Sequence, residues 1–373
     1  MKVMTIVGTR PEIIRLSRVI SKCDRYFEHV LVHTGQNFDY ELNQVFFKDL
    51  EIRAPDVFLD AAGQTAAATI AQVIERIDKV LAEIRPDAVL ILGDTNSALS
   101  AIAAKRRQIP IFHMEAGNRC FDFRVPEEIN RRIVDHISDV NLPYSQIARE
   151  NLLREGLPLD LTICTGSPMK EILTHYQNKI SASDILSKLT LKKDGYFLVS
   201  SHREENVDDP SILAKLIEVL IYLRTTYAIP VLVSTHPRTR ARLEVAGVTH
   251  QDGIIFHKPF NFTDYVRLQI DAKVVLSDSG TITEESSILN FRALNIRETH
   301  ERQEGMEEGA VMMVALEKDT IKAALAILED QPRGGERSLN IVSDYDCNNF
   351  SEKIVRIVQS YTAYVGRKIW RKN

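Results

Sequence analysis

Short apolar runs rich in β-branched residues alternate with longer stretches of helical periodicity along the whole chain. In the first half, strands are predicted at Lys2–Val7, Val30–His33, Ala88–Leu92, Ile111–Met114 and Val140–Leu142. Helices are predicted between them, over residues 11–22, 65–84, 96–107, 126–137 and 145–155. Strands separated by helices of this length are typical of βαβ units on a parallel sheet.

The second half repeats this rhythm. Its strands are predicted at Tyr196–Ser200, Pro230–Ser234, Ile254–Phe256, Val274–Ser277 and Ala293–Ile296. A chain of 373 residues exceeds one ordinary hydrophobic core, which favours two domains. Breaker residues near 165–168 mark a boundary. We therefore predict an α/β protein with two Rossmann-like domains, at 1–167 and 168–349, and a C-terminal segment, 350–373, whose helix can pack back on the first domain.

Composition narrows the functional classes. The formal net charge is −4, which lacks the strong basic excess of a nucleic-acid-binding protein. No run reaches 18 apolar residues, and the N-terminus enters a strand-like run without a secretory signal pattern. The four cysteines are scattered and form no CxxC pair, at positions 23, 120, 164 and 347. We expect a cytoplasmic protein with no membrane or nucleic-acid partner and no bound metal.

Ligands of open α/β sheets bind beyond the carboxyl ends of the strands, so the segment at 8–12, GTRPE, is the first candidate site. Thr9 and Glu12 have capping-box spacing, which explains them as a helix start. Arg10 is a cation at a helix N-terminus, where the macrodipole disfavours it. A bound anion would resolve that conflict, with Arg10 and Arg15 as phosphate ligands. GxGxxG is missing here, which argues against NAD, and we expect no cofactor.

Acidic residues follow the next strands. Asp94 either caps the following helix or faces a ligand, and Glu115 places a second carboxylate on the same edge of the sheet. Glu127 and Glu128 open a helix, where the dipole also explains a negative charge. Juxtaposed carboxylates raise one another's pKa, which suits proton transfer near neutral pH. Cys120 has no base beside it in sequence, so we assign it to packing.

Two histidines follow strands of the second domain. His202 lies in SSHREEN and His236 in STHPR. A lone histidine is more often structural than catalytic, but both positions are strand ends with charged neighbours. We therefore predict that both face the ligand.

The strongest phosphate signal is the segment at 277–285, SDSGTITEE. A strand runs there into small residues and then a helix, so amide groups and hydroxyls can face a diphosphate. Thr281 and Glu284 also have capping-box spacing, which is a purely structural explanation for that pair. Glu285 remains, and we predict that it binds the ribose hydroxyls.

The ordered set of strand ends resembles the non-hydrolysing UDP-N-acetylglucosamine 2-epimerase family over nearly the whole chain. The matching motifs are GTRPE at 8–12, GDT at 93–95, EAG at 115–117, PEExNR at 126–131, HREEN at 202–206, SDSG at 277–280 and ER-E at 301–304. Two longer stretches, EAGNRCFD and VPEEINRRIVDH, resemble the branch that forms UDP-N-acetyl-L-fucosamine from UDP-N-acetyl-6-deoxy-L-talosamine for surface polysaccharides.

The resemblance implies a glycosyltransferase-B-like fold, a homodimer and a UDP-sugar in the interdomain cleft. It implies a catalytic set at Asp94, Glu115, Glu127 and His202. It implies diphosphate and ribose contacts from Arg10, His202, Ser279, Gly280, Thr281 and Glu285, and a uracil contact near Lys258 to Phe260. Arg15 stands where many relatives have Lys, and Asn37 where the commoner enzymes have a His associated with an activating second UDP-sugar.

An epimerase of this kind needs no redox cofactor. Departure of UDP from C1 makes the adjacent C2–H acidic, and elimination gives a 2-acetamidoglycal. Protonation on the opposite face and return of UDP give the epimer, which requires proton-transfer groups on both faces. Three alternatives remain: a plain UDP-N-acetylglucosamine 2-epimerase, a glycosyltransferase of the same fold, and a non-catalytic UDP-sugar sensor.

Overall fold

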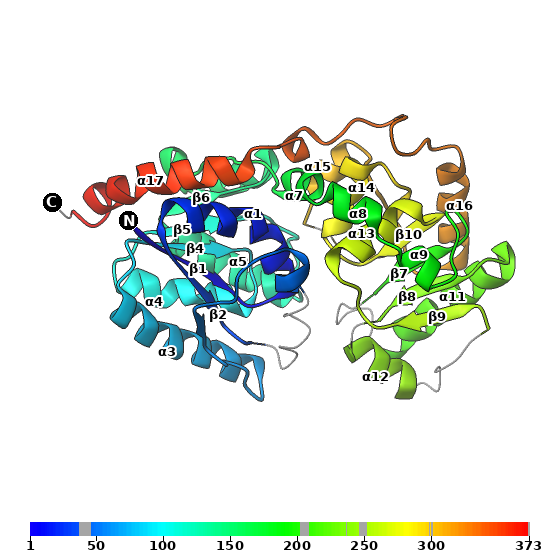
Figure 1. Cartoon of the computed structure of the whole chain (residues 1–373), viewed down its shortest axis with the longest axis horizontal. Helices are drawn as coiled ribbons and strands as arrows, with labels where there is room; N and C mark the ends of the chain where they lie inside the picture. The colour runs from blue at the N-terminus through cyan, green and yellow to red at the C-terminus, as the bar shows by residue number, and fades with distance from the viewer. Residues whose placement is uncertain are drawn as a thin grey trace. The chain divides into compact units, whose positions relative to one another are not determined.

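The computed structural model describes residues 1–36, 46–201, 209–235, 237–245, 252–297, 299 and 301–371. It divides into two compact units (Figure 1). The first is Met1–His175 with Asp344–Asn373, and the second is Tyr176–Ser343. The domain limits predicted at residues 167 and 349 lie close to these divisions but do not coincide with them.

The first unit contains a parallel six-stranded sheet with the strand order β3-β2-β1-β4-β5-β6. Its strands are β1 (Lys2–Val7), β2 (Glu28–His33), β3 (Val57–Phe58), β4 (Ala88–Leu92), β5 (Ile111–Met114) and β6 (Val140–Leu142). Its helices are α1 (Arg10–Tyr26), α3 (Ala66–Ile84), η1 (Asn96–Ser100), α4 (Ala101–Arg106), α5 (Pro126–Ile137), α6 (Gln146–Arg154), η2 (Leu159–Leu161), α7 (Met169–His175), η3 (Ser343–Tyr345, which begins at the division) and α17 (Phe350–Lys368).

The second unit contains another parallel six-stranded sheet, with the order β12-β11-β10-β7-β8-β9. Its strands are β7 (Phe197–Ser200), β8 (Val231–Ser234), β9 (Ile254–His257), β10 (Val274–Ser277), β11 (Ala293–Asn295) and β12 (Met312–Met313). Its helices are α8 (Gln177–Ala182), α9 (Ile185–Lys188), α11 (Pro210–Tyr227), α12 (Pro237–Val245), α13 (Phe262–Asp271), α14 (Thr281–Leu289), α15 (Gln303–Glu307) and α16 (Lys318–Glu329). The predicted α/β class with two Rossmann-like sheets is confirmed.

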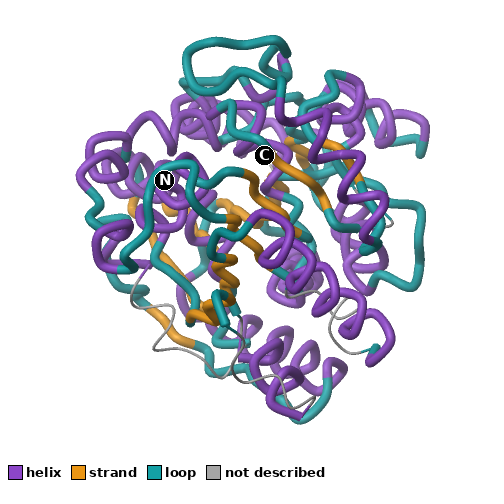
Figure 2. The backbone as a smooth tube through the Cα atoms, turned by 90° about the vertical axis from the view of Figure 1, so that its right-hand side faces the viewer, coloured by secondary structure: helices purple, strands orange, loops and turns teal. Residues whose placement is uncertain are grey.

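Burial explains why the central strands were readable in the sequence. All five residues of β4 are buried, as are five of the six in β1, because helices cover both faces of a parallel sheet. In the first unit, α1 and α17 lie on one face of the sheet and α3 and α4 on the other (Figure 1). Figure 2 shows the strands lying between helices. Within the described residues, no helix is long and apolar enough to cross a membrane.

The long C-terminal helix α17 is attached to the first unit along α1. Lys22 Nζ of α1 lies 2.8 Å from the carboxylate of Glu352, and the backbone amide of Ser351 donates to Glu171 of α7 at 2.8 Å. Buried apolar residues of α17, including Ile354 and Val358, complete this contact. The helix thus covers the sheet face that α1 alone would leave partly open.

Glu12 connects the loop after β1 to the loop after β4 through hydrogen bonds to its side chain. One of its carboxyl oxygens accepts a hydrogen bond from the Gly8 amide at 2.6 Å. The other accepts from the Thr9 hydroxyl at 3.0 Å and from the Thr95 hydroxyl at 2.6 Å. The predicted capping box is therefore wrong in its first half, because Thr9 occupies the N-cap without capping with its side chain. Burial raises the pKa of Glu12 from 4.5 to about 7, against the lowering effect of these hydrogen bonds.

Gly117 shows how closely the loop after β5 approaches α6. Its φ of +84° is left-handed, and a Cβ atom placed there would lie 2.2 Å from the backbone oxygen of Ala148. Gly156 has a similar φ of +88°, but a Cβ atom would meet nothing within 4 Å. The two glycines therefore separate backbone strain from steric collision.

We predict that Gly117→Ala lowers the free energy of unfolding by about 3 kcal/mol or more, because left-handed strain and a collision with backbone add together. Gly156→Ala, the matched control, is expected to cost only the strain, about 1 kcal/mol. Urea unfolding of both variants and the wild type measures the difference. Equal losses in the two variants would contradict the close approach.

We also predict that Glu12 makes stability depend on pH. Its pKa of about 7 in the folded chain exceeds the ordinary 4.5, so between these values the folded state binds more protons than the unfolded state. The stability that Glu12 contributes is therefore full below about pH 4.5 and is lost as the pH rises through 7. The free energy of unfolding of the wild type, minus that of Glu12→Gln, should fall by on the order of 3 kcal/mol across this window. A difference that is constant or rises with pH would refute it.

Candidate active site

The carboxyl ends of the first sheet's strands carry an interlocked set of polar loops. The hydroxyl groups of Thr34, after β2, and Ser97, after β4, lie 2.7 Å apart. A Cβ atom at Gly8 would lie only 1.8 Å from the Ser97 hydroxyl and 2.2 Å from that of Thr34. A side chain at Gly8 would have to displace both hydroxyl groups, so the three loops pack closely at this edge.

Asp94 presents a carboxylate at this edge. One oxygen, Oδ2, accepts from Arg131 Nε at 2.9 Å and lies 2.7 Å from its Nη2. Asn130 donates to the Asp94 backbone oxygen at 2.9 Å. The capping interpretation of Asp94 is wrong, because Thr95 is the N-cap of η1. Among the described residues, no side chain donates to Asp94 Oδ1, and the Asp94 side chain is 24% exposed, so a ligand can reach it.

Glu115 lies next to Asp94, at the end of the neighbouring strand. A Cβ atom at Gly93 would lie 3.8 Å from Glu115 Oε2, which places this carboxylate directly over the residue before Asp94. Glu115 has a left-handed φ of +64°, an uncommon conformation for a residue other than glycine. Arg15 Nη1 lies 3.3 Å from the same carboxylate, and the Arg15 guanidinium stacks 5.7 Å from the ring of Tyr144. Arg15, predicted as a phosphate ligand, is thus positioned against an acid.

The two acidic residues that open α5 have different surroundings. Glu128 is fully buried and pairs with Arg131 at 3.1 Å and Arg132 at 3.0 Å. It also accepts from the Cys120 amide at 3.0 Å. Glu127 lies in the first helical turn and is half-buried. Glu128 therefore holds the loop before α5, and Glu127 is the acid of this pair that a ligand can reach.

Cys120 is consistent with the packing role assigned to it. Its Sγ lies 3.4 Å from Glu128 Oε2. Burial raises the pKa of the Cys120 thiol, which disfavours the nucleophilic thiolate.

Arg10 is the first residue of α1, and its guanidinium lies 5.4 Å from the centre of the Phe46 ring. The side chain is half-buried, at the edge where the predicted anion would bind. His202 and His236 lie outside the described residues.

In the second unit, the predicted phosphate loop joins β10 to α14. The hydroxyl groups of Ser279 and Thr281 lie 3.0 Å apart, and Gly280 is the N-cap of the helix. The capping box predicted for Thr281 and Glu284 is wrong, because Thr281 is already helical and Glu284 is buried beside Arg302 at 3.3 Å. Instead, the Ser279 hydroxyl accepts from the Thr281 amide at 3.4 Å, in the first turn of α14.

Behind this loop lie charged residues that strand-end reasoning did not assign to the site. Glu301 Oε1 lies 2.8 Å from the position of a Cβ atom at Gly280, and Arg297 donates to Glu301 Oε2 at 2.9 Å. Arg302 is buried, at 2% exposure. The signal that could have found them was the motif ER-E at 301–304.

The remaining predicted contacts lie around α13 and β9. Glu285 is buried and accepts from Gln269 Nε2 at 2.6 Å, which leaves it fixed in place. Phe260 stacks on the His257 ring at 4.2 Å, nearly parallel, while Lys258 is exposed. Phe260 is 7% exposed and belongs to the core, so in this pair His257 and Lys258 are the more accessible residues.

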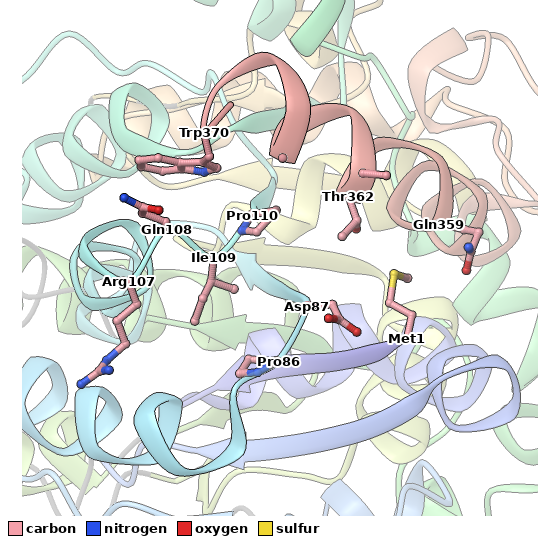
Figure 3. A pocket seen from close by; sticks show the side chains of 12 residues that line it. Met1, Pro86, Asp87, Arg107, Gln108, Ile109, Pro110, Gln359, Thr362 and Trp370 are labelled. Carbon is pink, nitrogen blue, oxygen red and sulfur yellow. The ribbon is translucent and has the colours of Figure 1, made fainter. Parts of the chain in front are cut away.

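A pocket of about 350 Å³ lies at the opposite, amino edge of the first sheet (Figure 3). Its lining includes Met1, Asp87, Gln108, Thr362 and Trp370. It contains none of the predicted site residues. Because ligands of such sheets bind at the carboxyl edge, we do not assign the reaction to this pocket.

Comparisons with known proteins identify the family of this chain. The chain matches the family model described as UDP-N-acetylglucosamine 2-epimerase over residues 21–359. It is 53% identical to a solved UDP-N-acetylglucosamine 2-epimerase from Rickettsia bellii, with a TM-score of 0.93 and 100% of each chain covered. The predicted glycosyltransferase-B-like fold is therefore confirmed.

Two more distant relatives carry information about ligands. The UDP-GlcNAc 2-epimerase of Methanocaldococcus jannaschii, solved in complex with UDP-GlcNAc and UDP, is 30% identical with a TM-score of 0.90, covering 96% of this chain and 100% of that one. The UDP-2,3-diacetamido-2,3-dideoxy-D-glucuronate 2-epimerase of Pseudomonas aeruginosa is 33% identical, over 86% of this chain and 90% of that protein. The chain therefore belongs to the UDP-N-acetylglucosamine 2-epimerase family, and it is an isomerase of the sugar-nucleotide epimerase class.

Proposed function

We propose that the chain inverts C2 of an N-acetylated UDP-hexosamine by elimination and return of UDP. The observation that carries this proposal is the pair of carboxylates at adjacent strand ends. Asp94 and Glu115 are each held by an arginine, Arg131 and Arg15 respectively, and both remain partly exposed.

The chemistry requires such a pair. The C2–H bond of an N-acetylhexosamine is not adjacent to a carbonyl group, so direct deprotonation is very unfavourable. As UDP leaves C1, positive character develops there and C2–H becomes acidic. One acid–base group then removes the proton and another delivers one to the opposite face. Asp94, Glu115 and Glu127 supply these groups in our scheme.

The leaving diphosphate needs groups that stabilise its negative charge and keep the UDP bound. The hydroxyls of Ser279 and Thr281, the N-terminus of α14 and the guanidinium of Arg10 have this chemistry. We assign the ribose to Glu285 and the uracil to the stacked Phe260 with Lys258. His202 keeps its predicted roles as a diphosphate ligand and a catalytic residue, and His236 keeps its predicted contact with UDP. The interdomain position of the ligand and the homodimer remain predictions.

For the sugar, we propose UDP-N-acetyl-6-deoxy-L-talosamine, which the reaction converts to UDP-N-acetyl-L-fucosamine for surface polysaccharide in the cytoplasm. The support is the match of EAGNRCFD and VPEEINRRIVDH to that branch of the family. The loop between Glu115 and Glu127 exposes two aromatic side chains, Phe121 at 66% and Phe123 at 65%. Such apolar surface suits a sugar with a methyl group at C6. UDP-GlcNAc, the ligand of the M. jannaschii relative, is the alternative substrate.

The first test is NMR of candidate UDP-hexosamines incubated with the protein in D2O without any acceptor. We expect the 6-deoxy-L-talosamine nucleotide to be turned over fastest, with solvent deuterium at C2 of the product. A C2 epimer that contains no deuterium would contradict proton exchange. Transfer that begins only when an acceptor sugar is added would identify a glycosyltransferase, and binding without turnover would identify a sensor.

The second test removes the proton-accepting oxygen of Asp94. Asp94→Asn should lower kcat at least about 100-fold with a much smaller change in KM, because the amide cannot accept the C2 proton. The matched control is Asp78→Asn on α3, whose exposed carboxylate pairs with Arg107 on the surface, and we expect wild-type turnover there. An Asp94→Asn variant that kept full turnover would exclude Asp94 from the scheme.

A further inference from the structure

His113 is a buried histidine of β5 that the proposed reaction does not use directly. It is fully buried and lies beside β4, where it is paired in register with Ile91. Its Nε2 lies 2.8 Å from the backbone oxygen of Gly93, the residue before Asp94. A carbonyl oxygen only accepts, so Nε2 must carry a hydrogen.

The other ring nitrogen faces an acid. His113 Nδ1 lies 2.9 Å from Asp135 Oδ1, and Asp135 is fully buried on α5. Arg119 Nη1 donates to Asp135 Oδ2 at 2.7 Å, and the Gly117 amide donates to both oxygens at 3.2 Å. These donors leave Asp135 as the anion that faces His113. Nε2 donates to the Gly93 oxygen, and Nδ1 faces this carboxylate as an ion pair without hydrogen-bond geometry, which favours a positively charged imidazolium ring.

The charges around His113 agree with this assignment. Burial alone lowers the pKa of His113, but the hydrogen bond and charge of Asp135 and the Gly93 carbonyl outweigh it and raise the pKa above its ordinary value. The charge of Asp94 acts in the same direction.

His113 also closes a ring of alternating charges that begins and ends at the Gly93–Asp94 peptide. Around the ring, each group contacts the next at between 2.6 and 3.3 Å, in the order Asp94, Arg131, Glu128, Arg132, Glu155, Arg119, Asp135, His113 and the Gly93 oxygen. With His113 protonated, the ring contains four cations and four anions. A neutral His113 would leave Arg119 as the one cation of this ring that faces Asp135, and the ring would then contain three cations and four anions.

We propose that His113 is a protonated positioning residue, which holds the Gly93 carbonyl and thereby sets the orientation of Asp94 for proton transfer. This inference rests on the proposed role of Asp94. Asp135 also positions the loop of the second acid, Glu115. It accepts from the amide of Gly117, which lies two residues after Glu115. One buried ion pair thus fixes the backbone of both acidic loops.

The spectroscopic test uses the wild-type chain and a histidine in the same sheet as the internal reference. His33, on β2, accepts a hydrogen bond from the Gly35 amide at Nδ1, and burial lowers its pKa to about 4, so it is neutral at pH 7. Nitrogen-15 NMR at pH 7 should show both ring nitrogens of His113 protonated and one nitrogen of His33 unprotonated. A neutral ring at His113 would overturn the proposal.

The kinetic test is His113→Gln, which keeps a donor for the Gly93 carbonyl and loses the charge. We expect kcat to fall about 10- to 100-fold with KM within about threefold, the pattern of a misplaced acid–base group. The control is His175→Gln, an exposed histidine at the end of α7, with wild-type kinetics expected. Wild-type kcat in His113→Gln would overturn the positioning role. If that variant does not fold, the NMR result decides alone.

The two proposals fail separately. A wild-type enzyme that forms no deuterated epimer from any UDP-hexosamine contradicts the proposed function, whatever the state of His113. A wild-type enzyme that exchanges C2, combined with a neutral His113 ring, contradicts only the positioning proposal.

Discussion

The buried carboxylate of Asp135 connects the two loops on which the candidate chemistry depends. It faces His113, which holds the backbone before Asp94, and it accepts from Gly117, which follows Glu115. The neighbouring guanidinium of Arg119 is 0% exposed and compensates its charge. Replacing such an ion pair with apolar residues is often neutral for stability, whereas removing one partner is costly. We therefore infer that His113, Asp135 and Arg119 position the two loops and add little to the free energy of unfolding.

The geometry that it holds is strained. Gly93, Glu115 and Gly117 all have positive φ angles, of +69°, +64° and +84°. A positive φ is strained at Glu115, because it has a side chain, and not at the two glycines. Such strained conformations persist only where surrounding contacts hold them. The backbone amide of Glu115 donates to Leu142, and its side chain meets Arg15. Strain and anchoring thus occur together at the residue that the mechanism needs.

The sequence predicted the central strands and the positions of the acids because buried parallel strands are continuous apolar runs, and their ends are polar. It missed β3 and β12, since a two-residue edge strand leaves no periodic signal. The predicted helix at 96–107 begins as the 3₁₀ helix η1 and continues as α4. The Thr95 hydroxyl accepts from the Ser97 amide at the start of η1. Local spacing also suggested a capping box for Glu284, but a buried ion pair with Arg302 determined that position.

Local sequence patterns also reveal only part of the candidate site. Asp94 and Glu115 could be named because each follows an apolar run, and Glu127 because it opens a helix within the motif PEExNR. Their anchors could not, since no local pattern links His113 with Asp135 or Glu12 with Thr95. Those contacts form only when the parallel strands bring loops from distant parts of the sequence to one edge.

The anchors also fit the proposed chemistry on two faces of a sugar carbon. Asp94 is held by Arg131, from α5, whereas Glu115 is held by Arg15, from α1. Different arginines thus hold the two side chains, while Asp135 connects the backbone of both loops. Proton removal and proton delivery in the proposed reaction require separate groups on opposite sides of C2. Two carboxylates with separate arginine partners can act as separate groups, whereas two carboxylates sharing one proton would act as a single titrating pair.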